Sequence, residues 1–419
     1  MKHIKLLFNR LRSSKDGKTV LANFGYLSLL QTANYVFPLI TLPYLARVLG
    51  VNAFGMLAIG TSVIAYFQTL IDYGFNFSTV KEIARHKNDH AFIEKIVAET
   101  MGARILFLIA SYLIIGLCIL FIPFFKENQV IILMTSTMLI GYTLMVDWFF
   151  QAIEDMKFIT IASVMSNLIT TILVFVVIKK QDDYILQPLL LSIGTTISSI
   201  MCWYIMIRKY SIHIFIPSIG LIINRIKDGF NMFVSIFLPT IYTNLNVILL
   251  GAYNGTTATG IYSGGVRFTS LAYRVTTLFS RVFYPFLARR MDKHGLYAKI
   301  SIIIGIAISL FFLLCADPLV NLFLGAEFAD TADVLRIVAL TPLAISIFNV
   351  YGTNYLAIQG YDNILKNIVL ITTIIGILFG ILGAIYFSYI GVALCSLMTQ
   401  TVRALLAFYY VKKIRRNER

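Results

Sequence analysis

Residues 38–60 read PLITLPYLARVLGVNAFGMLAIG, and residues 239–265 follow the same plan as PTIYTNLNVILLGAYNGTTATGIYSGG. Each stretch runs from a proline through apolar residues to a Leu-Gly pair, and two later glycines match if the second stretch carries a four-residue insertion. The matched positions are Leu49-Gly50 with Leu250-Gly251, Gly55 with Gly260, and Gly60 with Gly265. We interpret the chain as two repeats that begin with a helix of the same kind.

The composition places both repeats in a membrane. Of the 419 residues, 58% are hydrophobic and only 13% are charged, against roughly 25% charged in an average soluble protein. Apolar windows of about 20 residues, long enough to cross the hydrocarbon core, recur along the chain, and they are too uniformly apolar for barrel strands. The sequence therefore predicts an all-α membrane protein with about twelve transmembrane helices, over residues 20–46, 53–76, 97–122, 129–151, 157–178, 185–207, 229–251, 260–287, 297–322, 333–358, 364–386 and 389–411.

Six helices per repeat is an even number, so both repeats enter the membrane in the same orientation. Repeats of this kind are related by an axis along the membrane normal, and the substrate path lies between them. We expect an N-terminal lobe over residues 1–207, a cytoplasmic linker over 208–228 and a C-terminal lobe over 229–419.

The net charge of +15 is explained by topology. If the N-terminus is cytoplasmic, the outer loops hold only Arg47, Lys126, Lys179 and Lys180, and most other lysines and arginines fall on the cytoplasmic side. This asymmetry is the positive-inside pattern. It predicts that both termini are cytoplasmic, and it argues against nucleic-acid binding.

Three arginines lie seven residues apart within the predicted helix 260–287: Arg267, Arg274 and Arg281. Seven residues turn an α-helix by nearly two full turns, with a drift of only about 20°, so the three side chains share one face. Ser270 and Thr277 lie between them on that face. The other side is apolar and carries Phe268, Ala272, Val275, Phe279 and Val282.

An arginine at the centre of a lipid-facing helix costs about 2.5–3.5 kcal/mol, so we expect the stripe to face a water-filled cavity that binds an anionic substrate. The alternative is static pairing with carboxylates of neighbouring helices. The acids within or beside the first six predicted helices are Asp72, Glu99 and Asp147, all towards the cytoplasmic side. Arg104 and Arg403 are weaker candidates for the cavity, because each lies near a cytoplasmic end and can extend to the interface.

Motifs for catalysis or ATP binding do not occur. The stretch DGKT (residues 16–19) has the ending of a phosphate-binding loop, but residue 12, where that pattern requires glycine, is Arg12. The four cysteines lie in apolar helices without metal-ligand spacing. We therefore expect no enzyme, no ATP, no cofactor and no metal, with transport driven by a gradient or a partner.

Four motifs carry a resemblance to a known family: NYVFPLITLPYLARVLGVNAFG (34–55), DYGFNFSTVKEIA (72–84), DWFFQAIEDMK (147–157) and NVYGTNYLAIQGYDN (349–363). The chain resembles the O-antigen flippases, in the polysaccharide-exporter branch of the MOP exporter superfamily. The resemblance implies a V-shaped, alternating-access transporter of two six-helix lobes. It also implies a bacterial inner-membrane protein that moves an undecaprenyl-diphosphate-linked repeat unit to the periplasmic leaflet, with transport coupled to an ion gradient.

The resemblance also implies roles for particular residues. Arg267 falls where a cavity arginine is expected in that family, whereas Arg274 and Arg281 rest on the helical argument alone. Asp72 and Asp147 lie in family-like motifs and suggest gating or ion coupling, or else structural caps or ion pairs. A set of amides in the seventh and tenth helices either binds sugars or joins helices: Asn244, Asn246, Asn349 and Asn354.

The expected partners are the lipid-linked oligosaccharide, membrane lipids and the polysaccharide polymerase or assembly machinery. One alternative function is a cation-coupled multidrug exporter of the same superfamily, which is expected to use acidic and aromatic groups rather than an arginine stripe. A membrane-embedded polysaccharide polymerase is a second alternative, but its usual large outer loop is missing from the predicted topology.

Overall fold

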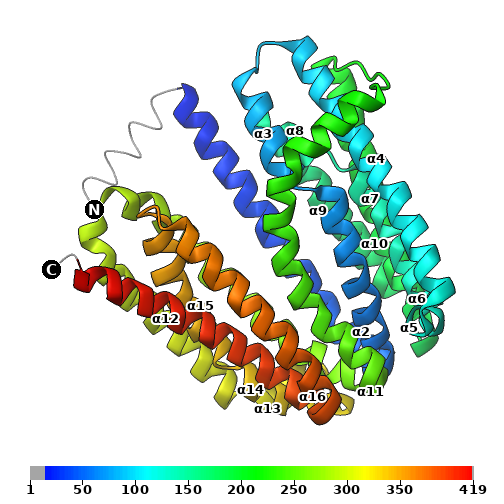
Figure 1. The fold of residues 1–419 in the computed structure, drawn as a ribbon. Coiled ribbons are helices and arrows are strands. Elements are labelled where there is room, and N and C mark those ends of the chain that lie inside the picture. Colours follow the sequence, from blue (N-terminus) through cyan, green and yellow to red (C-terminus); the bar gives the residue numbers. More distant parts are fainter. Residues whose placement is uncertain (1–14, 418–419) are drawn as a thin grey trace. The chain divides into compact units, whose positions relative to one another are not determined.

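The protein is all-helical in the computed structural model, which describes residues 15–417 and has no strand among them (Figure 1). The α-helices of the first half are α2 (Lys15–Asp72), α3 (Phe75–Arg85), α4 (His90–Phe121), α5 (Pro123–Glu127), α6 (Gln129–Ser136), α7 (Met138–Leu144), α8 (Asp147–Ala152), α9 (Lys157–Val177) and α10 (Leu186–Tyr210). Those that follow are α11 (Ile219–Arg289), α12 (His294–Leu314), α13 (Ala316–Phe323), α14 (Thr331–Val338), α15 (Thr341–Phe348) and α16 (Asp362–Asn417). Short 3₁₀ turns are η1 (Gln181–Ile185), η2 (Met291–Lys293) and η3 (Ala326–Phe328), and η4 (Asn349–Ala357) is a π-helix.

The predicted all-α membrane fold is confirmed. Eight helices among the described residues are long and apolar enough to cross a membrane, and the bent pair Met232–Leu238 and Thr243–Arg289 makes nine when it is counted as one span. Three of these nine are interrupted by a residue with non-helical backbone angles: Gly50 in α2, Gly255 in α11 and Ser388 in α16. Divided at these residues, the described chain has twelve membrane-length segments, and each break falls in a gap between two predicted helices.

The breaks also correct the repeat alignment. Gly50 (φ 72°) and Gly255 (φ 80°) both adopt the left-handed region that favours glycine. The equivalent of Gly50 is therefore Gly255, and not Gly251 as the Leu-Gly pairs suggest. In this register Gly50, Gly55 and Gly60 lie the same distance in sequence from their counterparts, so no insertion is needed after the break.

The glycines after the breaks bring two helices into close contact. A methyl group at Gly55 would lie 1.8 Å from the carbonyl oxygen of Thr256, and one at Gly260 would lie 2.1 Å from that of Val51. The Thr256 hydroxyl also donates to the Asn52 side chain. Small residues permit this backbone approach, as at many membrane helix interfaces.

Contacts divide the chain into two compact units. The first comprises the residues up to Tyr44 together with Val63–Thr240, and the second comprises Leu45–Ser62 with Ile241–Arg419. α2 and α11 therefore contribute residues to both units. The predicted lobe boundaries were assigned by chain order and stay predictions. They are an N-terminal lobe over 1–207, a linker over 208–228 and a C-terminal lobe over 229–419.

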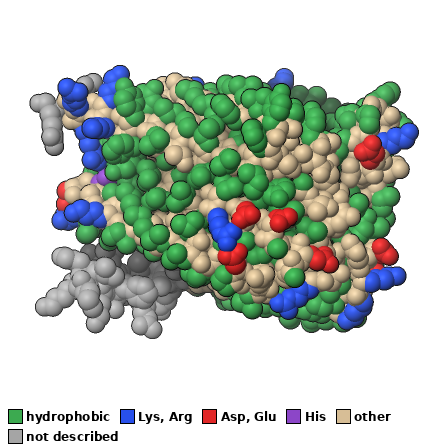
Figure 2. Space-filling view, turned by 90° about the horizontal axis from the view of Figure 1, so that it is seen from below, with side chains coloured by type: hydrophobic (Ala, Val, Ile, Leu, Met, Phe, Trp, Pro, Cys, Tyr) green, Lys and Arg blue, Asp and Glu red, His purple; other side chains and the backbone are tan. Residues whose placement is uncertain are grey.

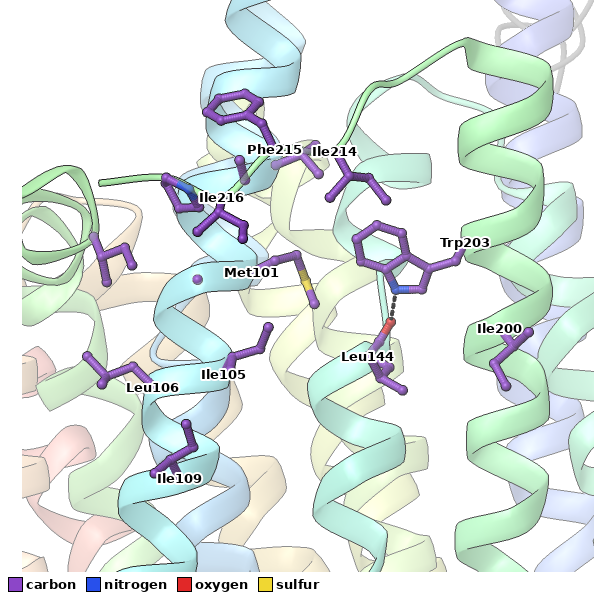
Figure 3. A pocket seen from close by; sticks show the side chains of 15 residues that line it. Met101, Ile105, Leu106, Ile109, Leu144, Ile200, Trp203, Ile214, Phe215 and Ile216 are labelled. Atoms are coloured by element: carbon purple, nitrogen blue, oxygen red, sulfur yellow. Dashed lines mark hydrogen bonds between the residues drawn. The ribbon is translucent and has the colours of Figure 1, made fainter. Parts of the chain in front are cut away.

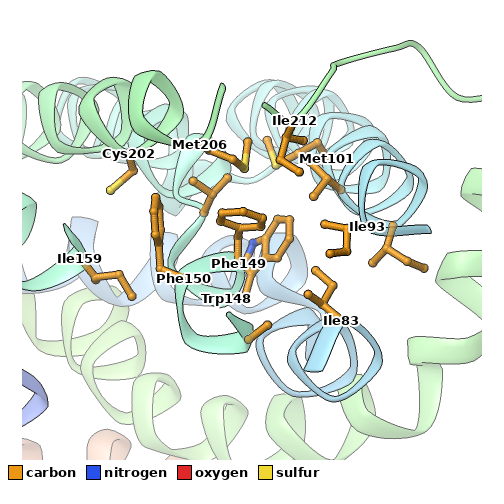
Figure 4. Packing of buried hydrophobic residues seen from close by; sticks show 14 of the residues in the cluster. Ile83, Ile93, Met101, Trp148, Phe149, Phe150, Ile159, Cys202, Met206 and Ile212 are labelled. Atoms are coloured by element: carbon orange, nitrogen blue, oxygen red, sulfur yellow. The ribbon is translucent and has the colours of Figure 1, made fainter. Parts of the chain in front are cut away.

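The first unit has an aromatic core centred on α8. Trp148, Phe149 and Phe150 are at most 1% exposed, and Figure 4 shows them surrounded by aliphatic and sulfur-containing side chains of the same cluster, including Ile83 of α3 and Met206 of α10. The motif DWFF, which carried part of the family resemblance, thus packs into the core. Its three buried rings hold the short helix α8, and with it Asp147, in place.

The surface is that of a membrane protein. Hydrophobic side chains are spread over the whole face drawn in Figure 2, and charged side chains gather towards its edges and in one group near its middle. Exposed side chains along the long helices include Leu113 of α4, Val176 of α9 and Leu378 of α16. Large apolar surface of this kind is stable in contact with lipid, so we conclude that the chain is a multi-pass membrane protein.

Candidate functional site

The arginine stripe lies on the exposed side of the helix that follows Gly255. Arg267, Arg274 and Arg281 are all exposed. On the opposite side of the same helix, Thr276 and Ser280 are 2% and 1% exposed, because they pack within the second unit. The three arginines therefore lie exposed on the face of this helix opposite its buried residues.

Arg267, the first arginine of the stripe in the sequence, contacts an aromatic ring. The Arg267 guanidinium lies 5.6 Å from the ring centroid of Phe54, a cation–π contact. Ser270, between Arg267 and Arg274, donates to the carbonyl of Arg267 at 2.7 Å. Neither Arg267 nor Arg281 forms an ion pair with any carboxylate whose side chain the structure describes. The static pairing considered above for these two side chains is therefore absent from the described part of the chain.

The predicted apolar side of this helix is divided between two environments. Phe268 and Ala272 are buried at 4% exposed, whereas Val275 and Val282 are more than half exposed. The buried pair packs within the unit. The exposed valines flank the arginine stripe, so the exposed surface of this helix carries both apolar and positively charged side chains.

A second charged group lies in the first unit, where Arg104 of α4 meets Asp72 at the end of α2. Arg104 is 2% exposed, and its Nη2 donates to Asp72 Oδ1 at 2.8 Å. Its Nη1 donates to the carbonyl of Met145. Both terminal nitrogens of the Arg104 guanidinium are thus bound by protein groups, which favours an internal role over direct substrate contact.

Asp147 adds a third charge to this group. It opens α8, its carboxylate accepts from the backbone N–H of Trp148 at 3.0 Å, and it interacts electrostatically with both Arg104 and Asp72. Asp72 forms the ion pair with the Arg104 guanidinium, and Asp147 lies close enough to interact with both charges. The group therefore carries a surplus negative charge when both acids are ionised. The structure brings together the two acids that the sequence predicted separately.

Replacing Arg104 by leucine should lower the melting temperature of the purified protein by several degrees, because it leaves Asp72 and Asp147 without their counter-ion. Breaking a buried ion pair from one side typically costs about 3–5 kcal/mol. The double variant Arg104→Leu/Asp72→Asn should recover part of this loss. Fluorescence-detected melting in detergent measures both, and a double variant as unstable as the sum of the single variants would contradict the pairing.

Arg403 and Asn244, two further predicted site residues, lie in the second unit. Arg403 Nε donates to Thr372 Oγ1 at 3.2 Å, and its guanidinium lies 5.6 Å from the Phe348 ring centroid. Asn244 makes a long hydrogen bond of 3.4 Å to the neighbouring Thr243 hydroxyl. Both side chains are partly exposed, and their roles in substrate binding stay predictions.

The three other predicted asparagines are buried. Asn246 donates to Ser396 Oγ at 3.2 Å, and Asn354 donates to Ser280 Oγ at 3.0 Å and to the Tyr297 hydroxyl. These contacts join separate helices of the second unit and favour the helix-joining alternative. Asn349, at the start of η4, differs because its buried amide nitrogen has no hydrogen-bond partner among the described residues.

The sequence did not reveal a buried ionic group that involves the predicted linker. Arg225, at the start of α11, is 4% exposed and donates to Glu82 Oε2 at 2.6 Å and to Thr79 Oγ1 at 2.5 Å. Glu82 and Thr79 belong to α3. These partners are far apart in the sequence, so no sequence pattern predicted the contact. The contact holds this part of the predicted linker in the first unit.

An apolar cavity of about 590 Å³ also lies in the first unit, between α4, α10 and the segment 211–218. Figure 3 shows Met101, Trp203 and Ile216 among the side chains around it, with the Trp203 indole donating to the carbonyl of Leu144 at 2.7 Å. Its lining offers almost no polar group, so it is unsuited to a phosphate or a sugar. Among the described residues, no group of three or more His, Cys, Asp or Glu side chains is arranged to hold a metal ion.

Comparison with known proteins identifies the family. Residues 20–291 match the family model described as polysaccharide biosynthesis protein. A protein of Escherichia coli (strain K12), provisionally named an O-antigen transporter, is 25% identical over 398 residues, covering 93% of this chain and 96% of its own. A Shigella dysenteriae protein with the same provisional name is 27% identical over 397 residues, covering 93% and 99%.

Solved structures with the same fold include the lipid II flippase MurJ in an inward closed conformation. It superposes with a TM-score of 0.72 at 15% identity, covering 92% of this chain and 87% of its own. An outward-facing multidrug resistance transporter of the MATE family, in the MOP superfamily, gives a TM-score of 0.56 at 14% identity and 97% coverage of both chains. The described helices therefore adopt the fold of these two-lobed membrane transporters.

Proposed function

Because the chain belongs to the family of polysaccharide biosynthesis proteins, we propose that it is a flippase for a lipid-linked polysaccharide precursor. The cargo is an O-antigen or related repeat unit on an undecaprenyl-diphosphate carrier, moved from the cytoplasmic to the periplasmic leaflet of a bacterial inner membrane. Both termini are cytoplasmic in this proposal. Relatives named as O-antigen transporters over nearly their whole length support it, as does the fold shared with a lipid II flippase.

The observation that carries the proposal is the exposed stripe of Arg267, Arg274 and Arg281. Three arginines facing lipid would cost roughly 7–10 kcal/mol in total, whereas a water-filled path that binds a diphosphate avoids this cost. Guanidinium groups donate paired hydrogen bonds to phosphate oxygens. Neighbouring arginines are seven residues apart, or about 10 Å along the helix, so a diphosphate can pass from one to the next. Arg403 and Asn349 are further candidates for contact with the substrate.

Asp72, Asp147 and Arg104 form the ion-coupling group of the proposal. A cation from the gradient, a proton included, compensates the surplus negative charge of two carboxylates beside one guanidinium. Binding or release of that cation then changes how firmly Asp72, at the end of α2, is held to α4. This coupling needs neither ATP nor a resident cofactor.

Deleting the gene and analysing carrier lipids tests the function. In a flippase mutant, the complete repeat unit accumulates on its diphosphate carrier at the cytoplasmic leaflet, because assembly enzymes on the other side receive no substrate. The expected result is therefore intact lipid-linked units with little surface polymer. Surface lipopolysaccharide that carries single repeat units would instead indicate a polymerase and refute flipping.

A further inference from the structure

A basic pocket lies at the C-terminal end of α16, and none of the stripe arginines lines it. We propose that it binds the phosphate headgroup of an anionic membrane lipid. The pocket has a volume of about 400 Å³ and lies in the second unit. Its lining is a mixture of three cations and three apolar or aromatic side chains: Lys412, Arg415, Arg416, Tyr351, Phe408 and Val411.

The three cations of this pocket form no ion pair with any carboxylate whose side chain the structure describes. Lys412, Arg415 and Arg416 are all exposed. Other basic side chains do pair, such as Arg290 with Asp292 at 3.0 Å. Three positive charges around one cavity produce a strong local attraction for an anion.

The Arg415 guanidinium is held in place before any ligand binds. His294, 2% exposed, directs its Nε2 at the carbonyl of Val350 at 3.0 Å. A carbonyl only accepts, so Nε2 carries the proton and Nδ1 accepts from Arg415 Nη2 at 3.2 Å. The guanidinium also lies 4.6 Å from the ring centroid of Tyr355. Fixing a long side chain in this way reduces the entropy lost on binding, which distinguishes this site from a mobile basic tail.

The position and the walls of the pocket identify the ligand as lipid-borne. The end of α16, the first residue of α12 and the π-helix η4 meet here, and ends of membrane-spanning helices lie at the depth of lipid headgroups. Tyr351, Phe408 and Val411 provide apolar walls beside the cations, which suits a phosphate attached to hydrocarbon. Basic pockets between transmembrane helices bind anionic headgroups in this manner.

Native mass spectrometry of the purified full-length protein, titrated with phosphatidylglycerol, tests the site. Arg415→Gln should weaken binding roughly tenfold, the loss expected for one charge-assisted hydrogen bond. Lys413→Gln is the matched control, because Lys413 is an exposed neighbour on the same helix that does not line the pocket. It should bind phosphatidylglycerol like the unchanged protein, and Arg415→Lys should be intermediate.

Equal weakening in Arg415→Gln and Lys413→Gln would overturn the proposal, since it would indicate general attraction to a basic tail. Inorganic phosphate at millimolar concentration should not displace the lipid, and displacement would show a site for free phosphate instead. If Arg415→Gln melts at a lower temperature, Lys412→Gln replaces it, because Lys412 lines the pocket without holding His294 or Tyr355. The assay involves no transport, so its failure leaves the flippase proposal untouched.

Discussion

Replacing Arg274 by glutamate should abolish surface polysaccharide in cells that depend on this protein. Arg274 is the central member of the stripe, about 10 Å along the helix from both Arg267 and Arg281. A carboxylate there removes a phosphate-binding group and repels the diphosphate at the midpoint of its path. Loss of one charge-assisted interaction alone corresponds to roughly a tenfold to hundredfold decrease. Gel analysis of surface polysaccharide in a complemented deletion strain measures the effect.

The matched control for this variant is Arg290→Glu, one residue beyond α11. Arg290 is exposed and pairs with Asp292, so this replacement makes the same change of charge outside the stripe and should leave surface polysaccharide unchanged. Arg274→Lys, which keeps the charge but not the planar donor pair, should retain part of the activity. Normal polysaccharide in cells that carry correctly inserted Arg274→Glu protein would exclude the arginine stripe as the substrate path.

Replacing Gly55 by alanine should strongly destabilise the protein. The added methyl group would lie 1.8 Å from the Thr256 carbonyl oxygen, and backbone atoms cannot move aside as a flexible side chain can. Separating the two helices also disturbs the contact of Gly260 with Val51. Overpacking typically costs about 1–3 kcal/mol, and a contact this short with backbone belongs at the upper end. A loss of about 3 kcal/mol corresponds to a melting temperature lower by about 5 °C or more.

Gly116→Ala provides the comparison, because nothing lies within 4 Å of a methyl group at that position in α4. Alanine is the better helix former by about 1 kcal/mol, so this variant should melt at the same temperature or slightly higher. Both proteins are measured by fluorescence-detected melting in one detergent. Equal melting of Gly55→Ala and the unchanged protein would contradict the close packing of these helices.

The transmembrane segments and the alignment of the arginine stripe were predictable because they depend on short-range properties. A run of about 20 apolar residues is long enough to span a bilayer whatever surrounds it. Likewise, a spacing of seven places Arg267, Arg274 and Arg281 on one face of any α-helix. The breaks near residues 50, 255 and 388 were visible as gaps in hydrophobicity, although the backbone angles of Gly50 and Gly255 were needed to correct the register of the repeat.

The partners of the other charged and polar residues could not be predicted. The sequence offered Arg104 as a weaker cavity candidate without indicating that it pairs with Asp72 inside the first unit. For Asn354 it left sugar binding and helix joining open, without indicating that its amide donates to Ser280 and Tyr297. Nothing in the sequence linked Arg225 to Glu82 or Arg415 to His294.

The reason for this division is physical. Hydrophobic length and helical periodicity act over one or two turns, so the chain alone defines where helices cross the membrane and which residues share a face. An ion pair or a hydrogen bond depends on atoms that approach within about 3 Å, and these atoms lie on segments far apart in the chain. Packing in the folded protein determines whether a charge such as Arg104 is buried in a pair or, like Arg267, remains exposed on a stripe.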